Sequence, residues 1–156
     1  DSSTTSRFIA TRIKEMNRHV TVVTNSIATS AIFENCESVS VVCIGGNLRK
    51  HNGSLVGPNA IATLEKYCAD YCFISPPAVD ATYGLTDHSE EEARIRECML
   101  NQSKKRYLVV DHTKFGWSCV NRIAGIDTID MIVTDSETEQ KWIHWFKSIK
   151  KEYKCC

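Results

Sequence analysis

Hydrophobic residues along this chain follow two different spacings, and their alternation predicts helices and strands in turn. Ile9, Ile13 and Met16 recur at the i, i+4, i+7 spacing of one helical face, which predicts a helix just after the polar start of the chain. Short β-branched or apolar runs predict buried strands. These runs are VTVVTN at 20–25, VSVVCIG at 39–45, YCFIS at 71–75, RYLVVD at 106–111 and DMIVTD at 130–135.

Helix patterns and turn signals separate these strands. The helix patterns cover 26–36, 58–68 and 88–100. Gly57-Pro58 can open the second of them, because proline at a first helical position lacks only an N–H that has no partner there anyway. Ser89 and Glu92 stand at capping-box spacing at the start of the third. Asn52-Gly53 predicts a hairpin turn, and Pro76-Pro77 cannot continue a central strand.

The end of the chain predicts one more helix. Ser136 and Glu139 again have capping-box spacing, and an apolar stripe follows them. The stripe consists of Trp142, Trp145, Phe146, Ile149 and Tyr153. Its two indoles either pack on the sheet or form an interface with another copy of the chain.

The order of these elements defines the fold class. Nearly continuous apolar strands that alternate with helices predict an α/β fold with a mostly parallel sheet and helices on both faces. No repeat, low-complexity segment or long linker divides the chain, so residues 1–156 are expected to form one domain.

Composition narrows the classes of function. Nineteen basic and nineteen acidic side chains cancel, so no overall field attracts the chain to nucleic acid or to an anionic membrane, and no apolar run approaches a membrane span. Eight cysteines without a C-x-x-C pair, and five histidines without ligand-like spacing, predict free thiols and no metal site. A soluble, cytoplasmic protein fits these features. His112 is the histidine of most interest, because it stands beside Asp111.

Polar residues follow the predicted strands, where the carboxyl ends of a parallel sheet collect ligand-binding groups. The strand ends are Thr24 to Ser26, Gly45-Gly46, Ser75 to Asp80 and Asp111 to Lys114. Hydroxyl residues ahead of a helix, as in DSSTT at 1–5, suit a phosphate, and so do the charges of Arg49 and Lys114. Asp80 and Asp111 can accept hydrogen bonds from sugar hydroxyls. The other interpretation is a loose polar end, solvated charges and carboxylates that only cap the backbone.

Seven segments in the same order resemble the C-terminal domain of DeoR-type bacterial transcriptional repressors. They are DSSTT, VTVVTNS, IGGNLRKHNGSLVGP, VDATYGLT, EEARIRECM, DHTKFG and IDMIVTD. Each segment is weak alone, but together they cover residues 1 to about 135 in register. The resemblance implies a fold like ribose-5-phosphate isomerase and glucosamine-6-phosphate deaminase, used here to sense a phosphorylated sugar.

The resemblance also implies which residues bind the ligand. The phosphate set is Ser2, Ser3, Thr4, Thr5, Arg49 and Lys114, and the sugar set is Asn25, Gly45, Gly46, Asp80, Gly84, Thr86, Glu92 and Asp111. No catalytic residue, metal or cofactor is expected. Such repressors act as oligomers and bind DNA through an N-terminal winged helix-turn-helix, which has no counterpart in these 156 residues. The chain is therefore expected to be the effector-binding part of a longer regulator.

Two departures from the family pattern keep other functions open. Ser3 replaces a glycine of the first loop, and Ser75-Pro76-Pro77-Ala78 replaces a stretch that is typically Gly-Ala-Asp-Gly. An isomerase or deaminase needs a carboxylate base. The related isomerases carry acids in that stretch, and here it has none, which favours a sensor over an enzyme. A ligand-free oligomerisation module is the third alternative.

Overall fold

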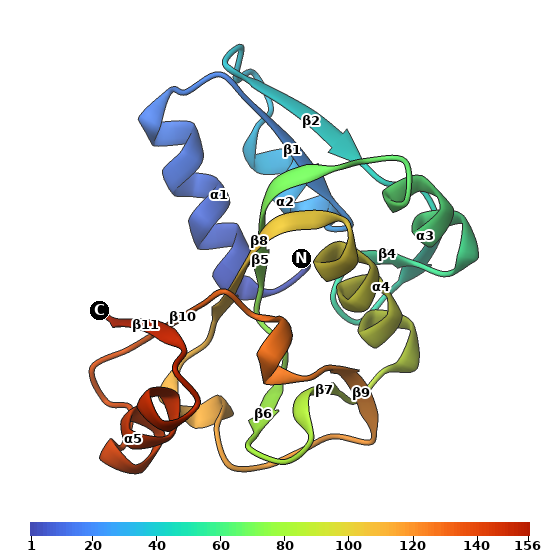
Figure 1. Cartoon of the computed structure of the whole chain (residues 1–156). Helices are drawn as coiled ribbons and strands as arrows, with labels where there is room; N and C mark the ends of the chain where they lie inside the picture. Colours follow the sequence, from blue (N-terminus) through green and yellow to red (C-terminus); the bar gives the residue numbers. More distant parts are fainter. The chain divides into compact units, whose positions relative to one another are not determined.

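The computed structural model describes residues 1–156, and these fall into two compact units (Figure 1). The first unit is Asp1–Tyr67 and the second is Cys68–Cys156. The α/β class with mostly parallel strands is confirmed, whereas the expectation of one domain over 1–156 stays a prediction. None of the helices has the length and apolar character that crossing a membrane requires.

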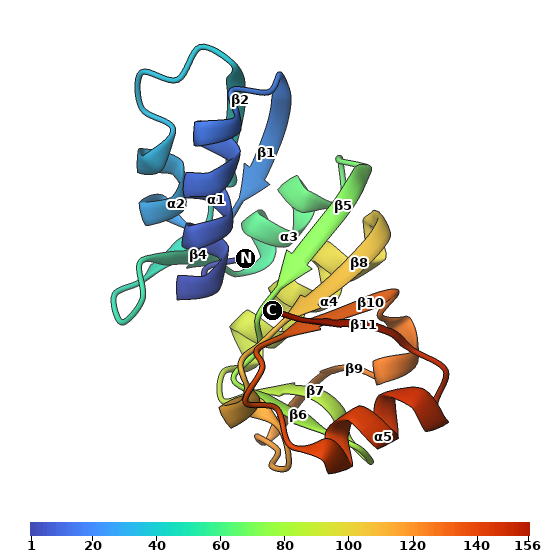
Figure 2. The ribbon, with the colours of Figure 1, turned by 90° about the vertical axis from the view of Figure 1, so that its left-hand side faces the viewer.

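The first unit is built around one pair of parallel strands. Its elements are α1 (Thr4–Met16), β1 (Val20–Thr24), α2 (Ile27–Ile32), β2 (Val39–Cys43), β3 (Asn47–Arg49), β4 (Ser54–Val56) and α3 (Pro58–Leu64). β1 and β2 pair in parallel from Val20 opposite Val39 to Thr24 opposite Cys43. α1 and α2 lie side by side (Figure 2). Ala10, Phe33 and Val39 form the buried core between these elements, and Ile13 of the predicted apolar face packs against it, whereas Met16 of that face is exposed.

A hairpin and two glycines shape the end of this strand pair. β3 and β4 pair antiparallel around Asn52-Gly53, which confirms the predicted turn. Gly46 has φ +132, and a Cβ there would lie 2.5 Å from the Val56 carbonyl oxygen, so only glycine fits. Gly45 has no such neighbour within 4 Å. The chain can therefore leave β2 and turn closely against β4.

The second unit contains a four-stranded sheet and a three-stranded sheet. Its elements are β5 (Ala69–Ile74), β6 (Ala78–Asp80), β7 (Gly84–Asp87), α4 (Glu90–Asn101), β8 (Ser103–Val109), β9 (Asn121–Ala124), β10 (Met131–Thr134), α5 (Gln140–Ser148) and β11 (Glu152–Cys155). The larger sheet is parallel, in the order β11-β10-β8-β5. The smaller sheet, β6-β7-β9, is antiparallel. α4 packs against β5, β8, β7 and β9, and α5 packs against β11.

The end of the chain differs from the sequence prediction. α5 stops at Ser148, and Tyr153 lies in β11, so the predicted stripe spans a helix and a strand. The predicted capping box at Ser136 is wrong: Glu139 is the N-cap residue, and it makes no side-chain cap bond. Lys150 takes a left-handed conformation, φ 53, which ends the helix, and residues 152–155 then pair with β10.

The aromatic side chains of this stripe pack together within the second unit. Trp142 stacks on Phe115 with ring centroids 5.5 Å apart, and Trp145 lies 5.7 Å from Phe146. Phe146 is fully buried and also contacts Tyr153. The indoles therefore pack on neighbouring aromatic rings and are half-buried, and an interface with another copy of the chain stays a prediction.

Candidate functional site

The DSSTT segment is ordered, and it forms the start of α1. Ser3 is the N-cap residue, and its Oγ accepts a hydrogen bond from the Ser6 amide at 3.0 Å. Asp1 folds back as well, because its Oδ1 accepts from the Ser3 amide at 3.1 Å and from the Ser6 hydroxyl at 2.5 Å. Ser3 has φ −71, an ordinary value for an L-residue, so serine in place of glycine causes no backbone strain here. The helix begins at Thr4, inside the polar run rather than after it.

Three segments of the first unit meet at the carboxyl end of β1. The Leu55 amide donates to the Asn25 carbonyl at 2.7 Å, and Ser26 forms a β-bridge with Ser54. The Asn52 side chain joins this hairpin to the start of the chain, since its Nδ2 donates to Ser2 Oγ at 3.4 Å. The start of α1, the end of β1 and the β3-β4 turn thus form one polar cluster, which we call the serine-asparagine cluster.

Two members of this cluster were not among the predicted site residues. Asn52 Oδ1 accepts a hydrogen bond from the Ser54 hydroxyl at 2.8 Å, so the two side chains form one unit at the hairpin turn. The sequence marked Asn52 only as a turn residue. Its placement beside Ser2 depends on a pairing between segments 50 residues apart.

Asn25 is the most unusual residue of the cluster. Its side chain is fully buried, yet neither its Oδ1 nor its Nδ2 has a hydrogen-bond partner. The hydroxyl of Thr29, which is 4% exposed, is also without a partner. Buried polar atoms are almost always satisfied, and each one left unsatisfied costs about 1–3 kcal/mol. Three such atoms in one region therefore need an explanation, and ligand binding by Asn25 stays a prediction.

The other predicted residues of the first unit lie near this cluster in sequence and structure. Gly45 and Gly46 follow β2, and the Ile44 amide just before them donates to the Thr24 carbonyl at 3.0 Å. Arg49 ends β3 and is half-buried. Thr4 is exposed and Thr5 is half-buried in the first turn of α1.

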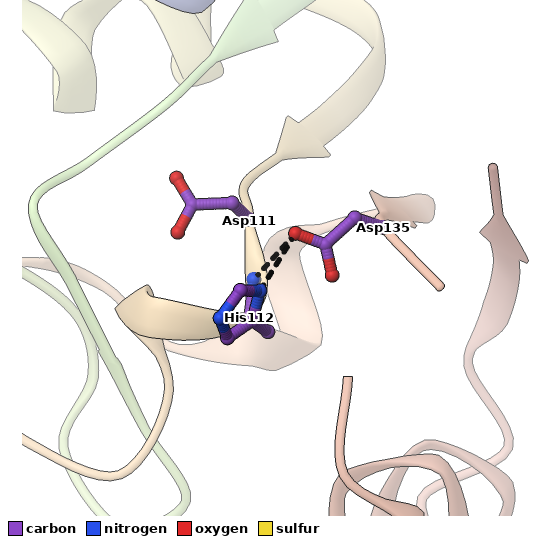
Figure 3. Close-up of side chains that lie close together, drawn as sticks. All are labelled: Asp111, His112 and Asp135. Atoms are coloured by element: carbon purple, nitrogen blue, oxygen red, sulfur yellow. Dashed lines mark hydrogen bonds and ion pairs between the residues drawn. The ribbon is translucent and has the colours of Figure 1, made fainter. Parts of the chain in front are cut away.

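The second unit brings together a different group at the ends of β8 and β10. Asp111 caps a short 3₁₀ helix, His112–Lys114, and its Oδ1 accepts from the amide and the hydroxyl of Thr113. His112 faces Asp135, which follows β10: the backbone N and Nδ1 of His112 lie 3.1 and 2.9 Å from Asp135 Oδ2 (Figure 3). His112 Nε2 lies 3.6 Å from Glu137 Oε2.

These contacts change the ionisation of both partners. The hydrogen bond to Asp135 raises the pKa of His112, and the small loss of solvation on folding opposes this rise only in part. Desolvation acts to raise the pKa of Asp135, but the hydrogen bonds from His112 outweigh it and lower that pKa. The pair is therefore charged over a wider pH range than either group alone.

The remaining predicted residues of the second unit have partners within the protein. Asp80 Oδ1 accepts from the amides of Thr82 and Tyr83, and Thr86 Oγ1 accepts from the Cys119 amide at 2.8 Å. Gly84 has φ +76, and a Cβ there would meet the Ala124 carbonyl oxygen at 2.4 Å. Glu92 is buried 3.8 Å from the guanidinium of Arg96. These contacts suit structural roles, and a part of any of these residues in ligand binding stays a prediction.

Comparison with known proteins places the chain in a family. The family model described as the DeoR C-terminal sensor domain matches residues 1–136. This chain belongs to the DeoR family of sensor domains. It is 35% identical over 135 residues to the HTH-type transcriptional regulator GlpR of Haloferax volcanii, covering 86% of this chain and 52% of that protein. The HTH-type transcriptional regulator IolR of Bacillus subtilis is 29% identical over 145 residues, which cover 93% of this chain and 57% of IolR.

A third relative is named for the regulon that it represses. The glycerol-3-phosphate regulon repressor of Haemophilus influenzae is 23% identical over 135 residues, covering 86% of this chain and 52% of the repressor. The chain thus spans about half the length of the curated relatives it matches. These relatives are named as transcriptional regulators, and the DeoR-type sensor domain shares its α/β class with this structure.

Proposed function

We propose that this DeoR-type sensor domain binds a phosphorylated sugar and that binding alters the DNA affinity of a helix-turn-helix region in the complete regulator. Asn25 is the observation that carries the proposal. Its buried amide and the buried Thr29 hydroxyl together have three donor hydrogens and two acceptor oxygens without partners in the protein. A sugar hydroxyl both donates and accepts, so a polyol matches such a mixed set.

The start of α1 suits the phosphate end of this ligand. α1 has 13 residues and no acidic side chain in its first turn, but the Asp1 carboxylate folds back onto this end of the helix, so a phosphate has to displace that carboxylate or bind beside it. Ser2 and Ser3 supply hydroxyls there, and the Ser2 hydroxyl is linked through Asn52 to the cluster that contains Asn25. Helix N-termini of this kind bind phosphate through backbone N–H groups. Arg49 is the proposed cationic partner within this unit, and the assignment of Lys114 to the phosphate stays a prediction from the sequence.

The names of the relatives support the class of ligand and the mode of action. One of them is named as the repressor of a glycerol-3-phosphate regulon. Glycerol-3-phosphate is a phosphorylated polyol. The proposed role is sensing without turnover, and it requires only that the ligand bind one regulator state more tightly. A coupling free energy of about 1–3 kcal/mol between the ligand and DNA sites changes operator affinity about 5- to 150-fold.

Calorimetric titration tests this proposal directly. The 156-residue chain is titrated with a panel of sugar and polyol phosphates and with the same compounds lacking phosphate, all in buffer that contains a chelator. We expect saturable one-to-one binding of at least one phosphorylated compound, much weaker binding of its unphosphorylated form, and no change in the compound by NMR. Conversion of the compound would favour an isomerase or deaminase, and absence of binding across the panel would favour an oligomerisation module.

Two charge substitutions locate the phosphate. Arg49→Ala and Lys114→Ala are each expected to weaken binding of the phosphorylated compound about tenfold, equivalent to about 1.4 kcal/mol, because each removes a charge-assisted hydrogen bond. Lys50→Ala and Lys105→Ala are the matched controls, since both lysines are exposed. Equal affinity in all four variants would overturn the phosphate assignment, even if the sugar binds.

A further inference from the structure

Asp111, His112 and Asp135 bring three metal-ligating groups to one place in the second unit (Figure 3). One carboxylate oxygen from each aspartate and one imidazole nitrogen all lie within 4.8 Å of one another. The sequence singled out His112 beside Asp111, but it could not indicate Asp135, which stands 23 residues after His112. The proposed sugar-binding function makes no use of His112 or Asp135.

The spacing of these atoms is close to that of ligands around one ion. Two ligands at about 2.1 Å from a transition metal, at bond angles between 90° and 109°, lie about 3.0–3.4 Å apart. His112 Nδ1 and Asp135 Oδ2 are 2.9 Å apart, near the lower end of that range. Two ligands on opposite sides of the ion would be about 4.2 Å apart. The ligand atoms of the whole group lie within 4.8 Å of one another, so a small side-chain rotation would bring them to the spacing of ligands around one ion.

The backbone holds these ligands in place without an ion. β8 and β10 are adjacent parallel strands paired through Val109 and Val133, and the Val110 amide donates to the Val133 carbonyl at 3.0 Å. Asp111 and Asp135 follow these two strands directly. Both loops that carry the proposed ligands begin at the ends of neighbouring strands. Binding of an ion would therefore require little further ordering of the chain.

A second set of hydrogen bonds orients the carboxylates. Asp135 Oδ1 accepts from the Glu137 amide at 3.2 Å and from the Thr138 hydroxyl at 3.3 Å, which directs Oδ2 toward His112. Thr113 holds Oδ1 of Asp111, whose carboxylate points away from Asp135 (Figure 3), so this ligand reaches a shared ion only after a side-chain rotation. Outer-shell bonds of this kind are typical of metal ligands.

We propose that Asp111, His112 and Asp135 bind one divalent transition-metal cation, with water in the remaining coordination positions. One imidazole and two carboxylates form a mixed nitrogen and oxygen set, which suits Mn²⁺, Fe²⁺ or Zn²⁺ better than the all-oxygen sites of Mg²⁺ and Ca²⁺ or the thiolate sites of Cu⁺. The ion takes the place of the proton that Nδ1 now donates to Asp135. Glu137, whose Oε2 lies near Nε2 of His112, adds negative charge that attracts the cation.

Mn²⁺ is the probe for this site, because the eight free cysteines of the chain are soft ligands that favour zinc and copper over manganese. Chelator-treated protein is titrated with MnCl₂ without any sugar, and free Mn²⁺ is followed by electron paramagnetic resonance. We expect one bound Mn²⁺ per chain, with paramagnetic broadening of the NMR signals of His112 and Thr113. His112→Asn and Asp135→Asn are each expected to weaken binding at least tenfold.

His144→Gln is the matched control, because His144 is exposed on α5 away from these loops in sequence. It should bind Mn²⁺ as the unaltered chain does, and circular dichroism should show that all three variants are folded. Equal affinity in the His112 and Asp135 variants, broadening spread over other acidic residues, or no bound Mn²⁺ at millimolar concentration would each overturn the proposal. Because no sugar is present, none of these results bears on the proposed sensing of a phosphorylated ligand.

Discussion

Each unit of this protein buries a group of polar side chains, and the two groups differ in whether their members have partners. In the second unit, Arg96 forms an ion pair with Asp87 and lies 3.8 Å from Glu92, and all three residues are at most 5% exposed. In the first unit, Asn25 and Thr29 are as deeply buried, yet three of their polar atoms have no partner. The two groups are thus buried to a similar extent, but the polar atoms have partners in one group and lack them in the other.

We interpret this difference as one between a structural group and the proposed binding group. A buried charge needs an opposite charge and hydrogen bonds to be tolerated, and Arg96 supplies one positive charge that the carboxylates of Asp87 on β7 and Glu92 on α4 share. Leaving Asn25 unsatisfied lowers stability, which a binding site tolerates because the ligand recovers that energy. Glu92, which the sequence placed in the sugar site, has a partner of its own, whereas Asn25 has none.

Removing the cation from the buried group of Arg96, Asp87 and Glu92 should give the largest loss of stability. Arg96→Met keeps much of the side-chain volume but leaves Asp87 and Glu92 buried without their cation. Removing one partner of a buried ion pair costs about 3–5 kcal/mol, so we expect a loss of that size in the free energy of unfolding. Urea unfolding followed by circular dichroism measures it.

Arg94→Met is the matched control, because Arg94 lies on the same helix and pairs with Glu90 in solvent, with 62% of its side chain exposed. An exposed i, i+4 pair contributes only about 0.3–0.5 kcal/mol. Equal losses in the two variants would show that burial does not distinguish the pairs and would remove the basis of the comparison.

The backbone around the unsatisfied group gives the next largest effect. Gly46→Ala forces a side chain into a left-handed conformation against the Val56 carbonyl, which costs about 1–3 kcal/mol of stability. Gly45→Ala, at the neighbouring position with nothing within 4 Å, should change stability by less than about 1 kcal/mol. Thermal unfolding of both variants measures this. A larger loss for Gly45→Ala than for Gly46→Ala would contradict the tight turn after β2.

Asn25→Leu tests the unsatisfied group itself. Leucine has a similar volume and no polar atoms, so the variant should be as stable as the unaltered chain or more stable, while its affinity for the phosphorylated ligand falls about tenfold or more. Urea unfolding and calorimetric titration measure the two quantities on the same samples. Asn101→Leu, at the exposed end of α4, is the control for the loss of an asparagine.

A loss of stability in Asn25→Leu would indicate that the amide has a structural role. The comparison between the two units would then fail, because both buried groups would support the fold. Unchanged ligand affinity would also contradict a binding role for Asn25.

Local signals in the sequence predicted the parts that depend on nearby residues. The parallel strands, the Asn52-Gly53 hairpin and the Ser89 N-cap of α4 follow from residues within a few positions of one another. The Ser136 capping box failed although its residue types were suitable, because the helix began later at Gln140. β11 was missed because its partner strand, rather than its own sequence, makes it a strand.

The site could be predicted only in part for the same reason. Asn25 was found from its place at a strand end, but the sequence cannot show that its amide is without a partner. Asn52 meets Ser2 across 50 residues, and Asp135 meets His112 across 23, so neither contact has a local signal. The register of adjacent strands determines the second contact, and register is a property of the folded sheet.

The smallest predicted effect concerns a paired but exposed group, the contact between His112 and Asp135. The pKa of His112 is raised by this hydrogen bond, so the pair stabilises the fold below the ordinary pKa of histidine, and that contribution is lost as the pH rises through the raised value. Asp135 has a lowered pKa, so its contribution is present above the ordinary pKa of aspartate and is lost as the pH falls through the lowered value. The pair should therefore act between these two limits.

Asp135→Asn removes the charge and keeps the shape, so the pKa of His112 should fall toward its ordinary value. An NMR titration of the imidazole signals, with chelator present, measures this shift, and the signals of the exposed His144 in the same spectra serve as the control. Stability should change far less than in Arg96→Met, because both partners are more than a third exposed and water screens their charges. An unchanged or raised pKa of His112 would show that Asp135 does not pair with it. A loss of stability as large as that of Arg96→Met would mean that pairing alone, without burial, controls how much a charged group contributes to this fold.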